Sequence, residues 1–140
     1  MADPLSITAS IIAIIQLTTK VVSYLQDVKH APRECQQCAI EASNLLSLLI
    51  NLRYHLESAT KEDPWFTAVT ALNVENGPFD QYRQALEELS CKVRIQEELE
   101  KIKRRVVWTL NKGEVERILQ RMERLKGLVS IALELDHLYV

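Results

Sequence analysis

The chain has 140 residues, of which 47% are hydrophobic and 26% charged, and its 17 Lys and Arg against 19 Asp and Glu give a net charge of −2. This apolar fraction excludes a disordered protein, and three Gly and four Pro are too few for a turn-rich all-β protein. Apolar residues recur at helical spacing along nearly the whole chain. We therefore expect one all-α domain over residues 1–140, an antiparallel four-helix bundle with an additional short helix between its second and third main helices.

The first expected helix begins at Asp3 and Pro4 and carries no ionisable side chain between Pro4 and Thr19. Its core-facing stripe follows steps of three and four residues and comprises Ile11, Ile14, Thr18, Val21, Leu25 and Val28, widened by Ile15 and Val22. Its outer stripe comprises Gln16, Lys20, Ser23 and Asp27 and continues upstream as Ala13, Ala9 and Ser6. The first half of this helix is therefore uncharged on every side, whereas the second half is amphipathic.

A helix that is apolar all round requires burial on all sides. Other helices can cover it, a second copy can pack on the small residues Ser6, Ala9 and Ala13, or it can enter a lipid bilayer. The uncharged run spans about 24 Å, less than the roughly 30 Å of a hydrocarbon core, which disfavours an ordinary transmembrane anchor. A cleaved signal peptide is disfavoured because Asp3, and no basic residue, precedes the run. We expect a buried helix at rest, with membrane insertion confined to an activated state.

Proline and turn residues separate the other expected helices: Pro32 precedes the second, Asp63-Pro64 follows it, Asn76-Gly77-Pro78 precedes the third, and Asn111-Lys112-Gly113 precedes the last. The expected core positions are Cys38, Ala42, Leu45, Leu49, Leu52 and Leu56 in the second helix, Trp65, Phe66, Val69 and Leu72 in the short helix, Phe79, Tyr82, Leu86, Leu89 and Val93 in the third, and Val115, Ile118, Met122, Leu125, Val129 and Ala132 in the last. In the third helix the apolar pattern then shifts phase to Leu99, Ile102, Val106 and Leu110, which predicts a bend or a change of packing partner near Arg94.

Basic residues are concentrated in one part of the chain, since residues 92–126 contain eleven Lys and Arg against six Asp and Glu. Basic groups beside an aromatic ring can hold anionic lipid headgroups, each contributing about 1 kcal/mol near such a surface. The candidate residues are Lys101, Lys103, Arg104, Arg105 and Trp108. The alternative is a solvated helix face with Glu–Lys and Glu–Arg pairs. We expect no nucleic-acid partner, because the chain is acidic overall and lacks a stacking or groove-reading motif.

Cys35 and Cys38 form a C-x-x-C motif, which elsewhere indicates a redox pair or half of a zinc site. No second ligand pair follows at a suitable spacing, so we expect reduced structural thiols in a reducing cytoplasm, with no metal and no cofactor. The chain has no Gly-rich phosphate loop, no nucleophile elbow and no pair of inward-facing carboxylates. We therefore expect no catalytic residues and no enzyme activity.

Three stretches carry a resemblance to a known family: residues 1–32 (MADPLSITASIIAIIQLTTKVVSYLQDVKHAP), residues 41–57 (EASNLLSLLINLRYHLE) and residues 114–136 (EVERILQRMERLKGLVSIALELD). They resemble the HeLo-like N-terminal domain of fungal STAND receptors, which are NLR-like proteins of innate immunity. In that family a NACHT or NB-ARC module and repeat domains follow in the same chain. The resemblance implies a programmed cell death effector, related to the HeLo domains of heterokaryon incompatibility and to the four-helix necroptosis killer domain. Some relatives carry a glycine zipper in the first helix, whereas this chain has no Gly before Gly77.

Two hypotheses of function follow, and self-association is expected in both. In the first, oligomerisation exposes the hydrophobic first helix of a domain that is cytoplasmic at rest, and this helix perturbs the plasma membrane, on anionic lipids, to cause regulated cell death. The membrane-inserting residues are then Leu5, Ile7, Ile11, Ile12, Ile14, Ile15 and Leu17. In the second, the bundle stays closed and acts as a homo-oligomerisation or adaptor module. Its contact surface is then the helix-packing stripe of Ser6, Ala9 and Ala13, or the apolar ending with Leu135, Leu138, Tyr139 and Val140.

Overall fold

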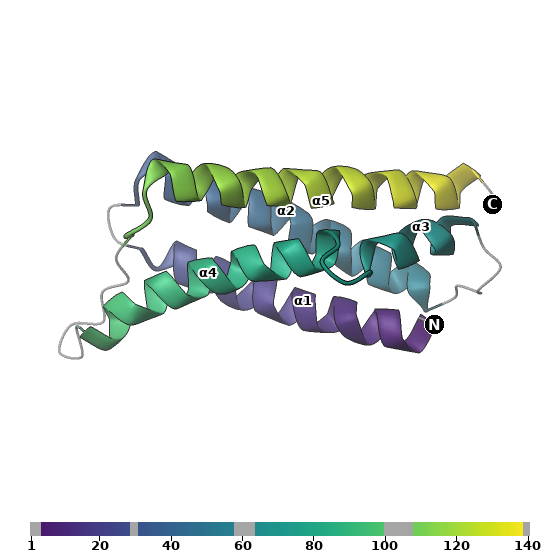
Figure 1. The fold of residues 1–140 in the computed structure, drawn as a ribbon, viewed down its shortest axis with the longest axis horizontal. Coiled ribbons are helices and arrows are strands. Elements are labelled where there is room, and N and C mark those ends of the chain that lie inside the picture. The colour runs from purple at the N-terminus through teal and green to yellow at the C-terminus, as the bar shows by residue number, and fades with distance from the viewer. Residues whose placement is uncertain (1–3, 29–30, 58–63, 100–107, 139–140) are drawn as a thin grey trace.

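The computed structural model describes residues 4–28, 31–57, 64–99 and 108–138. Within these ranges the chain forms five α-helices and no β-strand, which confirms the all-α class for this part of the protein. The helices are α1 (Pro4–Gln26), α2 (Arg33–Leu56), α3 (Pro64–Leu72), α4 (Pro78–Leu99) and α5 (Lys112–Leu138). Figure 1 shows α1, α2, α4 and α5 as long helices that lie along the long axis of the molecule, with α3 short. The start of α1 and the end of α5 lie at the same end.

The helix α5 packs against more of the other helices than α1 does. It packs against α2, α3 and α4, whereas α1 packs against α2 and α4. In Figure 1, α1 and α5 lie on opposite edges, with α2 and α4 between them. The main contacts of α5 are therefore with α2, α3 and α4, and those of α1 are with α2 and α4.

The predicted apolar seams meet in one hydrophobic core. Every predicted core position of the second, short and last helices is buried, as are those of the first helix except Ile15, which is half-buried. In α4 the predicted positions from Phe79 to Leu89 are buried, and Val93 lies beyond the side chains that the structure describes. Tyr82 and Phe79 are among the largest fully buried side chains, and both face the core from α4. The period of 3.6 residues therefore predicts the buried faces of these helices correctly.

Local turn chemistry sets the starts of α4 and α5. Asn76 has a φ of 58°, in the left-handed region that Asn adopts more readily than most residues. A Cβ on the following Gly77 would lie 2.7 Å from Val74 Cγ2, so this turn accommodates only glycine without rearrangement. At α5, Asn111 Oδ1 accepts a hydrogen bond from the Glu114 N–H at 2.9 Å, and Glu114 Oε1 accepts one from the Asn111 N–H at 3.2 Å. This reciprocal capping box explains why α5 begins at Lys112.

The prediction that the third main helix extends to Leu110 is wrong. The helix α4 runs without interruption through Arg94, where a bend or a change of packing partner is expected from the sequence, and residues 108–111 are not helical. Leu110 is nevertheless buried, because this non-helical segment packs against the core directly before the Asn111 cap. Ile102 and Val106 lie outside the described residues.

Candidate functional site

The helix α1 carries the residues predicted to insert into a membrane, and in this structure most of them lie wholly or partly inside the protein. Three are buried (Ile7, Ile11 and Ile14), three are half-buried (Ile12, Ile15 and Leu17), and one, Leu5, is 83% exposed. The outer stripe, Ser6, Ala9 and Ala13 followed by Gln16, Lys20, Ser23 and Asp27, is exposed throughout, as predicted. The first half of the helix thus presents an uncharged outer surface while its isoleucines contribute to the core.

The described residues contain one helix that is long and apolar enough to cross a membrane, Leu5–Gln26. Its 22 residues span about 33 Å at a rise of 1.5 Å per residue, which matches the roughly 30 Å of a hydrocarbon core. Core helices of soluble proteins and signal sequences meet the same criteria of length and composition. Only 28% of its most apolar stretch is buried, however, which is less than a helix enclosed on all sides would show.

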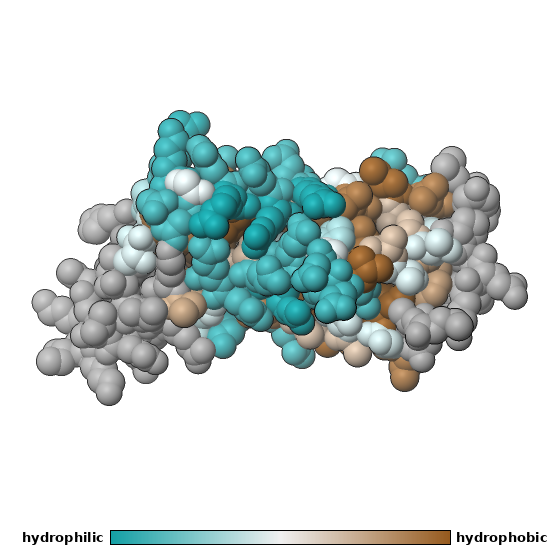
Figure 2. All heavy atoms as spheres, viewed as in Figure 1, coloured by the Kyte–Doolittle hydropathy of each residue, from teal (hydrophilic) through white to brown (hydrophobic). Residues whose placement is uncertain are grey.

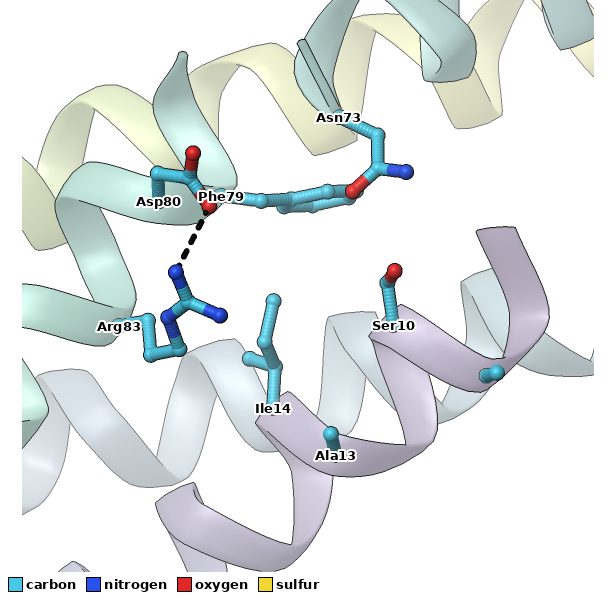
Figure 3. Close-up of a pocket in the computed structure, with 8 residues that line it drawn as sticks. Ser10, Ala13, Ile14, Asn73, Phe79, Asp80 and Arg83 are labelled. Atoms are coloured by element: carbon cyan, nitrogen blue, oxygen red, sulfur yellow. Dashed lines mark hydrogen bonds and ion pairs between the residues drawn. The ribbon is translucent and has the colours of Figure 1, made fainter. Parts of the chain in front are cut away.

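A cavity of about 300 Å³ separates part of the outer surface of α1 from α4. Figure 3 shows Ser10 and Ile14 of α1 directed toward it, with Asn73, Phe79, Asp80 and Arg83 on the opposite side. Ala9 and Ala13 also line it, and their methyl groups are too small to fill the space. An ion pair of 3.1 Å joins Arg83 to Asp80 within α4, and its exposure to water limits its contribution to stability. The helix-packing stripe therefore borders an open groove.

A buried polar contact joins α1 to α4 beyond this groove. The Thr18 hydroxyl donates a hydrogen bond to the Ile14 carbonyl oxygen at 2.8 Å, and Thr18 Oγ1 lies 2.9 Å from Tyr82 Oη. Because the Thr18 proton is used by Ile14, the Tyr82 hydroxyl is the donor in the second bond. Burial raises the pKa of the Tyr82 phenol above its ordinary value, and the hydrogen bond with Thr18 offsets part of this rise. Both hydroxyls are therefore protonated and satisfied inside the core.

The sequence analysis did not predict this contact, although the sequence contains a signal for it. Thr18 interrupts a stripe of aliphatic residues on α1, and Tyr82 is the hydroxyl-bearing residue in the apolar seam of α4. A buried hydroxyl needs a partner, so two hydroxyls on core faces are candidates for each other.

The predicted headgroup-binding residues are only partly described. Lys101, Lys103, Arg104 and Arg105 lie outside the described residues. Trp108 is half-buried and packs against the hydrophobic core. Part of the Trp108 ring therefore stabilises the fold, and the remainder is accessible to water or to a ligand.

Exposed hydrophobic side chains are unevenly distributed over the surface. Figure 2 shows hydrophobic residues gathered toward the end of the molecule that carries α3 and the end of α5, while the middle of this face is hydrophilic. The large exposed hydrophobic residues are Leu5, Ile40, Ile50, Tyr54, Val74 and Ile131. All but Ile40 belong to the start of α1, the second half of α2, the turn after α3 or the second half of α5.

The cysteines of the C-x-x-C motif are buried free thiols. The Cys35 thiol lies 3.7 Å from the Leu25 carbonyl oxygen, which accepts its hydrogen bond, and Cys38 is likewise inaccessible. Burial raises the pKa of Cys35 to about 11 and that of Cys38 to about 12, from an ordinary value of 9.0. Such thiols are poor nucleophiles at neutral pH. Among the described residues no group of three or more His, Cys, Asp and Glu is placed to hold a metal ion.

Raising the pH above 9 is expected to lower the free energy of unfolding through these two thiols. The unfolded chain loses its thiol protons near the ordinary value of 9.0, whereas the folded chain keeps them until about 11 to 12. The unfolded state then binds fewer protons, so stability falls as the pH rises between these values. Urea denaturation at several pH values in this range measures the decline. The free energy of unfolding should fall less steeply with pH in the Cys35→Ala/Cys38→Ala variant than in the wild type. Cys91→Ala, which removes an exposed thiol, is the control and should show the wild-type slope. Equal slopes in all three proteins would contradict the role given to the two buried thiols.

No known protein family, curated protein or solved structure matches the chain. The resemblance to HeLo-like domains and the functional hypotheses therefore stay predictions.

Proposed function

We propose that the chain is a HeLo-like effector domain that perturbs membranes after oligomerisation, and that the structure described above is its resting state. In this proposal the fold is an antiparallel four-helix bundle of α1, α2, α4 and α5, with α3 as the additional short helix. The observation that carries the proposal is the state of α1. Its isoleucines are buried or half-buried, the outer surface of its first half is uncharged, and the main contacts of α5 are with α2, α3 and α4.

In water, burial of apolar surface favours the state in which α1 is packed against the rest of the bundle. Six of its apolar side chains are buried, namely Ile7, Ile11, Ile14, Val21, Val22 and Leu25. At roughly 2 kcal/mol for each, burial of these side chains contributes about 12 kcal/mol, which is comparable to the whole stability of a typical domain. The free-energy cost of releasing α1 is therefore offset only when lipid or a second copy covers the same apolar surface.

Activation then requires that many copies be brought together. A NACHT or NB-ARC module in the same chain would supply this by raising the local concentration of the domain. The released α1 would enter the bilayer through its uncharged half, with the residues from Leu5 to Leu17 in contact with lipid. Lys101, Lys103, Arg104 and Arg105, with Trp108, would hold anionic headgroups at the surface. The domain is then a non-enzymatic effector, cytoplasmic at rest and attached to the plasma membrane when active.

The second candidate is a homo-oligomerisation or adaptor module that never touches lipid. The exposed hydrophobic residues at the α3 end of the molecule favour it, because an apolar patch of this kind commonly marks a protein interface. In this case α1 stays in place, and Ala9 and Ala13 or the apolar end contact a second copy.

Dye leakage from liposomes distinguishes the two candidates. The domain is fused to an inducible oligomeriser and added to vesicles of anionic or zwitterionic lipid, with and without inducer. The effector proposal predicts leakage that requires both the inducer and anionic lipid. If verified clusters form and neither type of vesicle leaks, the effector proposal is wrong and the adaptor remains.

A further inference from the structure

The Thr18–Tyr82 contact is a buried polar link between α1 and α4. Among the described residues, the buried polar side chains are Thr18, which is 0% exposed, and Ser90. Thr18 belongs to α1 and Tyr82 to α4, and their oxygens are 2.9 Å apart. A hydrogen bond of this kind fixes one register of α1 on α4, since a slip by one helical turn moves Thr18 by about 5.4 Å and breaks it.

We propose that the Thr18–Tyr82 hydrogen bond is a latch that holds α1 on α4 in the resting domain and sets how readily α1 is released. The proposal rests on the proposed function, because release of α1 is the step that it controls.

The position of the latch along α1 suits this role. Thr18 lies where the uncharged half of the helix ends, two residues before Lys20. Through the Thr18 bond to the Ile14 carbonyl oxygen, the latch is continuous with the turn that carries Ile14 beside the cavity. Toward the start of α1, that cavity separates the outer surface of α1 from α4, so direct contact between the two helices is weaker there. Opening the latch therefore loosens the α4 side of a segment that then stays in place mainly through its packing on α2.

The two partners of the latch are not equivalent. If Thr18 is replaced by Val, the Tyr82 hydroxyl is left buried without its acceptor, which carries a desolvation penalty. If Tyr82 is replaced by Phe, the Thr18 hydroxyl keeps its bond to the Ile14 carbonyl oxygen and remains satisfied. If both are replaced, the interface becomes apolar with nearly unchanged shape, a change that is often close to neutral. The latch thus predicts that Tyr82→Phe rescues Thr18→Val.

Amide hydrogen exchange measures the opening of α1 directly. We expect Thr18→Val to speed exchange of the α1 amides about tenfold relative to the α5 amides, and Tyr82→Phe to speed it only about threefold. The double variant should exchange no faster than Tyr82→Phe. Tyr54→Phe, which removes the hydroxyl of an exposed tyrosine in α2, is the matched control and should leave exchange unchanged. Val129→Ala, in the core of α5, should speed α1 and α5 amides together.

Two exchange results would overturn the latch. One is an equal acceleration of α1 and α5 amides in Thr18→Val, because the contact would then stabilise the whole domain. The other is a double variant that opens more than Thr18→Val, because the two substitutions would then act independently.

The liposome assay separates failure of the latch from failure of the proposed function. With both correct, Thr18→Val should leak dye at a lower inducer concentration than the wild type. Selective exchange of α1 in a domain that never causes leakage would support the latch and refute the membrane function. Leakage by the clustered wild type, combined with uniform exchange in Thr18→Val, would support the membrane function and refute the latch.

Discussion

The clustered domain carrying Ala9→Lys and Ala13→Lys is expected to release dye from anionic liposomes at least about tenfold more slowly than the clustered wild type. A lysine near the centre of a bilayer costs about 3 kcal/mol, and each 1.4 kcal/mol changes an equilibrium tenfold. Both alanines are exposed at rest, so the longer side chains extend into water or into the cavity without disturbing the core. Asp80 and Arg83 both line this cavity, and the Asp80 carboxylate already accepts hydrogen bonds from Arg83 and from the Asn76 N–H, so an added lysine there meets no unpaired opposite charge that would favour the closed state. A loss of leakage would then reflect the free-energy cost of placing charged side chains in the bilayer.

The matched control is Ile40→Lys/Ile50→Lys, which adds the same two charges at exposed apolar positions of α2. It should leak like the wild type, because α2 is not the inserting helix. Circular dichroism and urea denaturation verify that both variants keep a folded bundle. Equal loss of leakage in the two variants would mean that net charge, and not insertion of α1, governs the effect.

Ile11→Asp is expected to lower the free energy of unfolding by about 4 kcal/mol or more. Ile11 is fully buried, so the new carboxyl group would lie in an apolar core without a polar partner. A loss of this size is a large fraction of the roughly 5 to 15 kcal/mol that stabilises a typical domain. Urea denaturation followed by circular dichroism measures it.

Ile40→Asp is the control for this substitution, because it makes the same chemical change at a side chain that is 60% exposed. Its effect should stay within about 1 kcal/mol, since surface substitutions rarely cost more. Similar losses in the two variants would contradict the placement of α1, whose apolar face would then not lie against the core.

Periodicity predicted the buried faces well because each helix carries its own pattern. The seam from Cys38 to Leu56 in α2 and the seam from Val115 to Ala132 in α5 depend only on the steps between neighbouring turns. The sequence placed a turn over Asn111-Lys112-Gly113 before the last helix, whereas α5 begins at Lys112; the capping-box spacing of Asn111 and Glu114 is the sequence signal for that start.

Features that depend on two helices together were not predictable in this way. The pairing of Thr18 with Tyr82 requires the register of α1 on α4, which periodicity within each helix leaves open. The cavity beside Ala13 depends on how far apart α1 and α4 lie. The wrong extension of the third helix to Leu110 has a related cause, since burial of an apolar residue does not require that its backbone be helical. Periodicity therefore identifies faces, whereas tertiary packing decides how they meet.

The packing of α1 on both α2 and α4 also matters while the protein is being made. Thr18 and Tyr82 are 64 residues apart in the chain. At about 5 to 20 residues per second, the ribosome adds Tyr82 roughly 3 to 13 seconds after Thr18. During this interval α2 is the first neighbour that can cover α1, and the α4 side of the helix stays open. In the nascent chain, the apolar surface of α1 that α4 buries in the folded domain is therefore exposed for seconds. A chaperone or a nearby bilayer can bind this surface until α4 has been translated.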